Sequence, residues 1–360
     1  MQGSPQSIRG RGAAGNPKNR FERLEYVRDD EFVDPDDVSD DACAPETVFL
    51  KDPSRSIIAR NDSPDIGFDA GVNPYRGCEH GCVYCYARPT HEYLGYSAGL
   101  DFETKILVKE KAPALLRKAL SSPGWTPRVV ALSGATDPYQ PAERGLGIAR
   151  GCLEVFLEFR NPVVVITKNR LVTRDVDLLA DLAQSGAAAV CLSVTTLDAR
   201  LSRNLEPRAS LPQRRLEAIE ILAAAGVPAG VLVAPVIPGL TDHELPSILS
   251  AAAGAGARFA GYILLRLPYG VSSLFEDWLS RHFPDRKEKV LNRVRAIRGG
   301  WLNDPRFRSR MKGEGVFAEQ IENLFSVARR KAGLSGGKPN LSTGAFRWPA
   351  GAQLDLFGRG

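Results

Sequence analysis

Three cysteines stand within eight consecutive residues, in the segment GVNPYRGCEHGCVYCYAR. Cys78, Cys82 and Cys85 form a C-x3-C-x2-C arrangement on one short stretch, so their thiolates can converge on a single metal centre. The other three cysteines are scattered, and six cysteines so unevenly placed do not build a disulfide framework. The arrangement indicates a metal site rather than structural disulfides.

The metal is either zinc or part of an iron–sulfur cluster. A structural zinc site takes four ligands, typically from two separated pairs, and the sequence offers no obvious fourth ligand. His80 lies inside the loop, where joint coordination with its neighbours is awkward. Three cysteines suit an iron–sulfur cluster that keeps one iron open for a substrate or cofactor. The spacing therefore favours a cluster over zinc.

Apolar runs alternate with helix-periodic stretches between about residue 70 and residue 266, which is typical of βα units in a parallel sheet or barrel. The candidate strands span residues 71–75, 129–133, 163–167, 189–195, 230–236 and 261–266. The main helix candidates between them span residues 145–160, 174–185, 212–225 and 241–254. Residues 104–109 are expected to form a strand outside the main sheet.

Polar segments follow these strands, at the edge where a parallel barrel gathers its binding and catalytic groups. They read SGATDPYQPAE, TKNR, TTLD and PVIPGLTD. Cofactor and substrate contacts are expected on them.

The cysteine loop resembles the signature of radical S-adenosylmethionine (SAM) enzymes, C-x3-C-x-aromatic-C after the first strand, with Tyr84 as the aromatic residue. The sequence Y-C-Y and the segments TDPYQPxE, ITK, SVTTLD and PVIPGLTD are similar to the branch of spore photoproduct lyase and its photolyase-like relatives. This resemblance covers roughly residues 65–270. It implies an α/β fold with a partial, TIM-like (β/α)6 barrel.

The resemblance also implies the cofactors and their chemistry. Cys78, Cys82 and Cys85 would hold a [4Fe–4S] cluster whose open iron binds SAM. An electron donor such as flavodoxin or ferredoxin would reduce the cluster, and cleavage of SAM would give a 5′-deoxyadenosyl radical that abstracts hydrogen from a substrate.

Candidate SAM contacts follow from the same resemblance. The segment from Ser133 to Thr136 would contact the SAM amino group, Lys168 its carboxylate, and Ser193 and Thr195 its ribose. Arg208 would bind the carboxylate or a substrate phosphate, although an ion pair that stabilises the fold is an open alternative. The full set of expected cofactor contacts is Tyr84, Ser133, Thr136, Lys168, Ser193, Thr195 and Arg208.

One position departs from the family pattern. Spore photoproduct lyase has a hydrogen-donating cysteine just before the serine of its second-strand segment, and the corresponding residue here is Ala131. Neither Cys152 nor Cys191 clearly replaces it. Tyr86 and Tyr139 are candidates for relaying a hydrogen atom in its place.

Charge divides the chain into four expected parts. Residues 1–50 are expected to be a disordered arm, basic and then acidic, with 11 acidic residues between positions 22 and 46. Residues 51–280 would form the barrel. Residues 281–345 would form a basic helical extension, because positions 281–331 hold 14 Lys and Arg against 6 Asp and Glu. Residues 346–360 would form a flexible tail.

The sequence predicts a cytoplasmic protein. No stretch approaches the roughly 18 uninterrupted apolar residues of a membrane span. The N-terminus MQGSPQSIRGRGAAGNPKNR also lacks the apolar core of a signal peptide.

The leading hypothesis is a radical SAM enzyme that repairs or modifies nucleic acid, most simply DNA. It rests on the family branch, the basic extension and the tail. A radical SAM enzyme that acts on a protein or small molecule is the alternative, and a non-catalytic iron–sulfur protein is the second, because a fold does not fix a function.

The tail carries the pentapeptide QLDLF, which is similar to the motif by which bacterial replication and repair proteins dock on the β sliding clamp. Gln353, Leu354, Leu356 and Phe357 are the matching residues, and such a tether would raise the local concentration of the enzyme near DNA. The alternative is a tail whose apolar end packs back on the barrel.

A peptide covering residues 346–360 is expected to bind purified clamp, because Leu356 and Phe357 would fill an apolar pocket while Gln353 fixes the register. Binding is measured by fluorescence anisotropy. The control peptide has these three residues changed to alanine and should not bind. Equal binding by both peptides, or binding by neither, would rule out the clamp.

Overall fold

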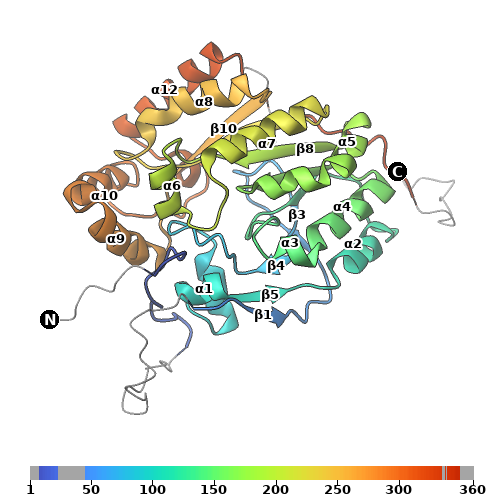
Figure 1. Cartoon of the computed structure of the whole chain (residues 1–360), viewed down its shortest axis with the longest axis horizontal. Helices are drawn as coiled ribbons and strands as arrows, with labels where there is room; N and C mark the ends of the chain where they lie inside the picture. Colours follow the sequence, from blue (N-terminus) through green and yellow to red (C-terminus); the bar gives the residue numbers. More distant parts are fainter. Residues whose placement is uncertain (1–7, 23–44, 335–336, 338, 349–360) are drawn as a thin grey trace.

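The computed structural model describes residues 8–22, 45–334, 337 and 339–348 (Figure 1). The sliding-clamp motif therefore lies outside the described residues. Two sheets are present, one of seven strands and one of three.

The larger sheet has the strand order β10-β9-β8-β7-β6-β3-β2. Its parallel strands are β3 (Ala70–Val72), β6 (Val130–Leu132), β7 (Val163–Thr167), β8 (Ala188–Ser193), β9 (Ala229–Val236) and β10 (Phe259–Leu264). These six strands follow the chain without a reversal, so right-handed crossovers place every connecting helix on the same face. The sheet curls around its other face, and the predicted partial (β/α)6 barrel is confirmed.

The barrel stays open at one side. An antiparallel strand, β2 (Ile58–Arg60), covers β3 at one edge, while β10 forms the other edge. Within the described residues β10 does not pair with β3, so hydrogen-bonded strands do not close the barrel between these two edges.

Helices cover the outer face at nearly the predicted places (Figure 1). They are α2 (Ala112–Leu120), α4 (Ile148–Phe159), α5 (Val176–Gln184), α7 (Pro212–Ala224) and α8 (Leu245–Gly254). The second of these starts three residues later than expected, because a separate short helix, α3 (Glu143–Leu146), precedes it. That helix ends at Gly147 with φ 65°, a left-handed conformation that glycine adopts without strain.

A continuous apolar layer joins the helices to the strands. Val165, Val190 and Val231 face the helices from three adjacent strands, and Phe156 and Leu222 meet them from α4 and α7. All five side chains are essentially inaccessible to solvent. This layer fixes the strands, so the polar segments at their carboxyl ends stand on a rigid base.

The first predicted strand divides between the two sheets. Residues 70–72 form β3 in the barrel, whereas Tyr75–Arg76 form β4 in the smaller sheet, with strand order β1-β5-β4. The other strands of the small sheet are β1 (Val48–Lys51) and β5 (Lys105–Val108), so the strand expected outside the main sheet is confirmed. The chain therefore leaves the barrel just before the cysteine loop begins.

The N-terminal segment differs from the disordered arm expected for residues 1–50. Residues 8–22 lie against the cysteine loop, where the N–H groups of Gly12 and Ala13 donate to the Glu103 carboxylate at 3.0 and 2.9 Å. Glu103 is fully buried in α1 (Leu100–Thr104) and forms an ion pair with fully buried Arg88. A buried carboxylate needs hydrogen-bond donors, and the N-terminal segment supplies two of them.

The C-terminal helices continue the fold rather than standing apart from it. They are α9 (Val271–His282), α10 (Lys287–Ala296), α11 (Ser309–Lys312) and α12 (Val316–Lys331). Ile321, Phe325 and Ala328 of α12 join the main apolar core beside α8, and Phe325 contacts Tyr262 of β10 (Figure 1). Among the described helices, none combines the length and apolarity that a membrane crossing requires.

Glu103→Ala is expected to lower the free energy of unfolding by about 3–5 kcal/mol, because it leaves Arg88 as an unpaired buried charge. Urea denaturation measures the loss. The control is Glu158→Ala, which removes a half-exposed pair with Arg117 and should cost about 0–1 kcal/mol. Equal small losses in both variants would contradict the importance of the buried pair.

Candidate cofactor and metal site

The cysteine loop is a series of tight turns whose backbone carbonyls are hydrogen-bonded by one buried arginine. Cys78 donates its N–H to the Phe102 carbonyl at 2.9 Å, and Cys85 donates to the Cys82 carbonyl at 3.2 Å. Arg88 donates to the carbonyls of Cys82 and Gly81 at 2.9 and 3.1 Å. The loop conformation is therefore fixed by the protein itself.

The three thiols fit the ligand set of an iron–sulfur cluster. None is in a disulfide, and Cys85 contacts both the apolar cluster around Cys82 and the one around Cys78. Burial raises the pKa of the Cys82 thiol, and the nearby Glu206 carboxylate and the other two cysteines raise it further. Such thiols lose their protons when a metal centre supplies the compensating charge.

A zinc site at this loop is not supported. His80 is buried, and both ring nitrogens have partners: Nδ1 lies 3.3 Å from the Asp137 carboxylate, and the Asn169 amide donates to Nε2 at 3.2 Å. Among the described residues, no three His, Cys, Asp or Glu side chains gather closely enough to hold one metal ion.

Lys168 points into the barrel and is not a surface residue. Its Nζ donates to the Ala234 carbonyl at 3.1 Å and lies 3.8 Å from Glu206 Oε1. The same nitrogen lies 5.9 Å from the centroid of the Tyr84 ring, and only 14% of the side chain is exposed. The end of β7 therefore presents a cation beside the cysteine loop.

Glu206 is the centre of this region, and the sequence reasoning missed it. Tyr84 and Arg215 donate to its carboxylate, and Thr195 donates to it at 2.8 Å. Burial alone would raise the pKa of Glu206, but the Arg215 and Lys168 charges outweigh burial and lower it to about 2. The available signal was its place in LSRNLEPRA, where the arginines alone were considered.

Thr195 contacts Glu206 directly, whereas Ser193 is linked to it only through Arg215. Thr195 Oγ1 lies 3.2 Å from the Tyr84 hydroxyl, in addition to its bond with Glu206. Ser193 is buried, and its carbonyl accepts from Arg215 at 2.8 Å. Their expected contact with the SAM ribose stays a prediction.

The segment after β6 is held in a strained conformation. Ser133 has φ 151° and Gly134 has φ 128°, a region that favours glycine. The Asn73 side chain, not predicted as a site residue, accepts from the N–H groups of Ala135 and Thr136 at 2.9 and 3.2 Å. Ser133 Oγ and Thr136 Oγ1 donate to backbone carbonyls, so any contact with the SAM amino group also stays a prediction.

The two tyrosine candidates lie in different places. Tyr86 is 46% exposed on the cysteine loop and donates to the Gly134 carbonyl, with the Arg266 guanidinium 4.3 Å from its ring centroid. Tyr139 is fully buried and donates to Asp175 at 3.0 Å on the helix side of the sheet. Its hydroxyl is therefore already bonded to Asp175, and its role as a hydrogen relay stays a prediction.

Arg208 forms the ion pair that the sequence left open. Its Nη1 lies 3.0 Å from Glu79 Oε1 and donates to Thr47 Oγ1 at 3.2 Å. Its backbone N–H donates to the His80 carbonyl at 3.3 Å. The guanidinium thus forms an ion pair with Glu79 of the cysteine loop. This geometry does not support its expected contact with SAM or phosphate.

The other cysteines do not replace the missing hydrogen donor. Ala131 is buried in β6, whereas Cys152 is buried among the apolar side chains of α4. Cys191 lies two strands away on β8, where burial raises its pKa to about 12. Neither thiol stands at the Ala131 position.

The sequence is similar to one known protein family and to several individual proteins. The family model described as "Radical SAM superfamily" matches residues 72–252. An uncharacterised protein of Mycobacterium tuberculosis is 38% identical over 245 residues, covering 67% of this chain and 71% of the relative. The radical SAM Nalpha-GlyT isomerase of Pseudomonas phage M6 is 26% identical over 174 residues, covering 48% of this chain and 34% of the relative.

A solved structure shares the fold. A mutant of spore photoproduct lyase superposes with a TM-score of 0.53 at 14% identity, covering 79% of this chain and 80% of that one. At this low sequence identity, the superposition shows that the two proteins share a fold, and it does not show that they catalyse the same reaction.

Lys168→Ala is expected to weaken SAM binding by about 1.5–3 kcal/mol, because it removes a charge-assisted bond but no cysteine. Isothermal titration measures the affinity, and iron and sulfide content should stay unchanged. Lys118→Ala on the exposed face of α2 is the matched control. Unchanged SAM affinity in Lys168→Ala would contradict the role given to this lysine.

A variant without Cys78, Cys82 and Cys85 should lose iron and sulfide altogether.

Proposed function

This chain belongs to the radical SAM superfamily, and on that premise we propose that it binds a [4Fe–4S] cluster through Cys78, Cys82 and Cys85 and acts on nucleic acid. Members of the superfamily are enzymes that use such a cluster together with SAM. The observation that carries the assignment of ligands is the loop itself, where three free thiols share one fixed turn beside Lys168.

When bound, the cluster held by Cys78, Cys82 and Cys85 would supply one electron to SAM, and this would provide the radical chemistry. The chain contributes binding and orientation. Arg88 holds the loop backbone so that the cysteine side chains keep their directions. Lys168 Nζ would hold the SAM carboxylate, as a buried cation does with most effect where little water competes.

The remaining expected contacts would orient the rest of SAM. The strained segment from Ser133 to Thr136 would meet its amino group at the end of β6. Thr195 is already positioned by Glu206 at the end of β8. Tyr86, which donates to the Gly134 carbonyl, would relay a hydrogen atom near that segment.

Three features support nucleic acid as the substrate class. The segments after the strands resemble those of the spore photoproduct lyase branch, the chain from 281 to 331 is basic, and the tail carries a clamp-like motif. Because Ala131 stands where that branch has its donor cysteine, the reaction would differ from dimer cleavage by the same route. Repair or modification of DNA is the specific proposal, with the sliding clamp as a tether and flavodoxin or ferredoxin as reductant.

Nucleic acid is expected to stimulate SAM cleavage severalfold. Reconstituted protein is incubated without oxygen with SAM and reductant, with damaged or undamaged DNA or RNA, and 5′-deoxyadenosine is quantified. The control without the three loop cysteines should form none.

Stimulation by a protein fraction or a metabolite pool instead would favour the alternative substrate classes. Full iron and sulfide content with no SAM cleavage under any condition would leave a non-catalytic iron–sulfur protein.

A further inference from the structure

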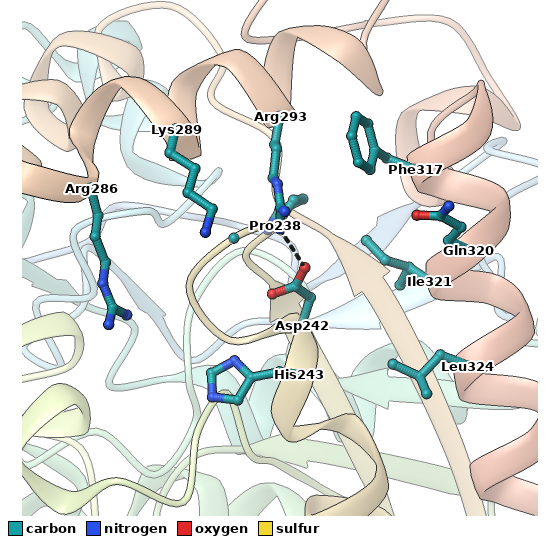
Figure 2. Close-up of a pocket in the computed structure, with 11 residues that line it drawn as sticks. Pro238, Asp242, His243, Arg286, Lys289, Arg293, Phe317, Gln320, Ile321 and Leu324 are labelled. Atoms are coloured by element: carbon teal, nitrogen blue, oxygen red, sulfur yellow. Dashed lines mark hydrogen bonds and ion pairs between the residues drawn. The ribbon is translucent and has the colours of Figure 1, made fainter.

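A groove of about 510 Å³ lies between α10, α12 and the loop that follows β9 (Figure 2). None of the three loop cysteines and none of the seven residues named as expected SAM contacts lines it. Its lining is divided by chemistry, with cationic side chains on one wall and apolar ones on the other.

The cationic wall comes from one face of the segment 286–293. Arg286, Lys289 and Arg293 are spaced three and four residues apart, so they share that face. Figure 2 shows all three directed toward the groove, with His243 opposite. Arg293 lies 3.3 Å from Asp242, whereas Arg286 and Lys289 have no ion pair with any residue that the structure describes. The wall therefore keeps a positive surplus.

The opposite wall is an exposed aromatic and aliphatic surface on α12. Phe317 is 41% exposed and Leu324 is 37% exposed, with the mostly buried Ile321 between them. The Arg293 guanidinium lies 5.4 Å from the Phe317 ring centroid. A flat apolar ring thus stands directly beside a row of cations.

The groove opens at the same edge of the barrel as the candidate cofactor site. Pro238 and Gly239 line it and begin two residues after the end of β9, whose Ala234 carbonyl accepts from Lys168. Arg293 packs on this loop so closely that a Cβ at Gly239 would lie 3.1 Å from its Cδ. One short loop therefore separates the groove from the barrel mouth.

We propose that this groove binds a single-stranded segment of nucleic acid, with phosphates along Arg286 and Lys289 and an unpaired base stacked on Phe317. This inference rests on the proposed function and deepens it. Cations that follow a backbone, with an aromatic ring for the bases, are the two elements of single-strand binding. A paired base cannot present its face to the ring, so the groove selects single strands over duplex.

The test measures binding of a fluorescent single-stranded DNA oligonucleotide to the full chain by anisotropy, over a series of salt concentrations and without SAM or reductant. Removing two phosphate contacts in the double variant Arg286→Ala, Lys289→Ala should reduce the slope of log K against log salt by about 1.4. Phe317→Ala should weaken binding by at least about fivefold and leave the slope unchanged.

The matched control is Arg330→Ala, Lys331→Ala, which removes the same charge from the end of α12 outside the groove. It should alter the slope little. Equal slopes in the groove variant and the wild type would overturn the proposal, as would equal losses in the groove and control variants. Tighter binding of duplex than of single strand, or displacement of the oligonucleotide by an acidic peptide at lower concentration, would also overturn it.

These measurements test the groove and the proposed function separately. An oligonucleotide that binds through the groove but does not stimulate SAM cleavage contradicts the proposed function and leaves the groove intact. Stimulated cleavage with wild-type binding in both groove variants contradicts the groove alone.

Discussion

Arg88 and Glu103 form a fully buried ion pair beneath the cysteine loop, and the surrounding backbone converges on both partners. Arg88 donates to four carbonyls, those of Gly81, Cys82, Ala98 and Gly99. Glu103 accepts two N–H groups from the N-terminal segment. Burying two charges is costly, and only such complete pairing offsets the loss of hydration. The pair therefore joins the loop, α1 and the N-terminal segment to one another.

A second buried pair, Arg215 with Glu206, organises the opposite side of the site. Arg215 also binds the Ser193 carbonyl, which ties the pair to the end of β8. Tyr84 connects the two halves, because it belongs to the cysteine loop and donates to Glu206. The distance between the thiols and the Lys168 ammonium is thus set by a network of charged and hydrogen-bonded groups, which has little freedom to relax.

The barrel and the cysteine loop could be predicted from sequence because their signals are local. Six apolar runs gave six parallel strands, and three cysteines on one loop needed no distant partner to be recognised. Contacts between residues far apart along the chain could not be predicted in this way. Nothing local indicates that Tyr139 donates to Asp175, and Glu206 has no local signal apart from its arginine neighbours. Residues 8–22 have a composition typical of a linker, and they are ordered by the charge of Glu103, about ninety positions away.

Gly12 shows that the folded structure around the cysteine loop includes residues that precede the matched family domain. It approaches the cysteine loop so closely that a Cβ at this position would lie 1.8 Å from the Gly81 carbonyl oxygen, so only glycine fits there. The radical SAM family model begins at residue 72, sixty positions later. A protein trimmed to the matched residues, or a domain exchanged at that boundary between two relatives, would keep the three loop cysteines and lose the backbone donors of Glu103. The modular unit of this enzyme is therefore discontinuous in sequence, and its first piece precedes the barrel.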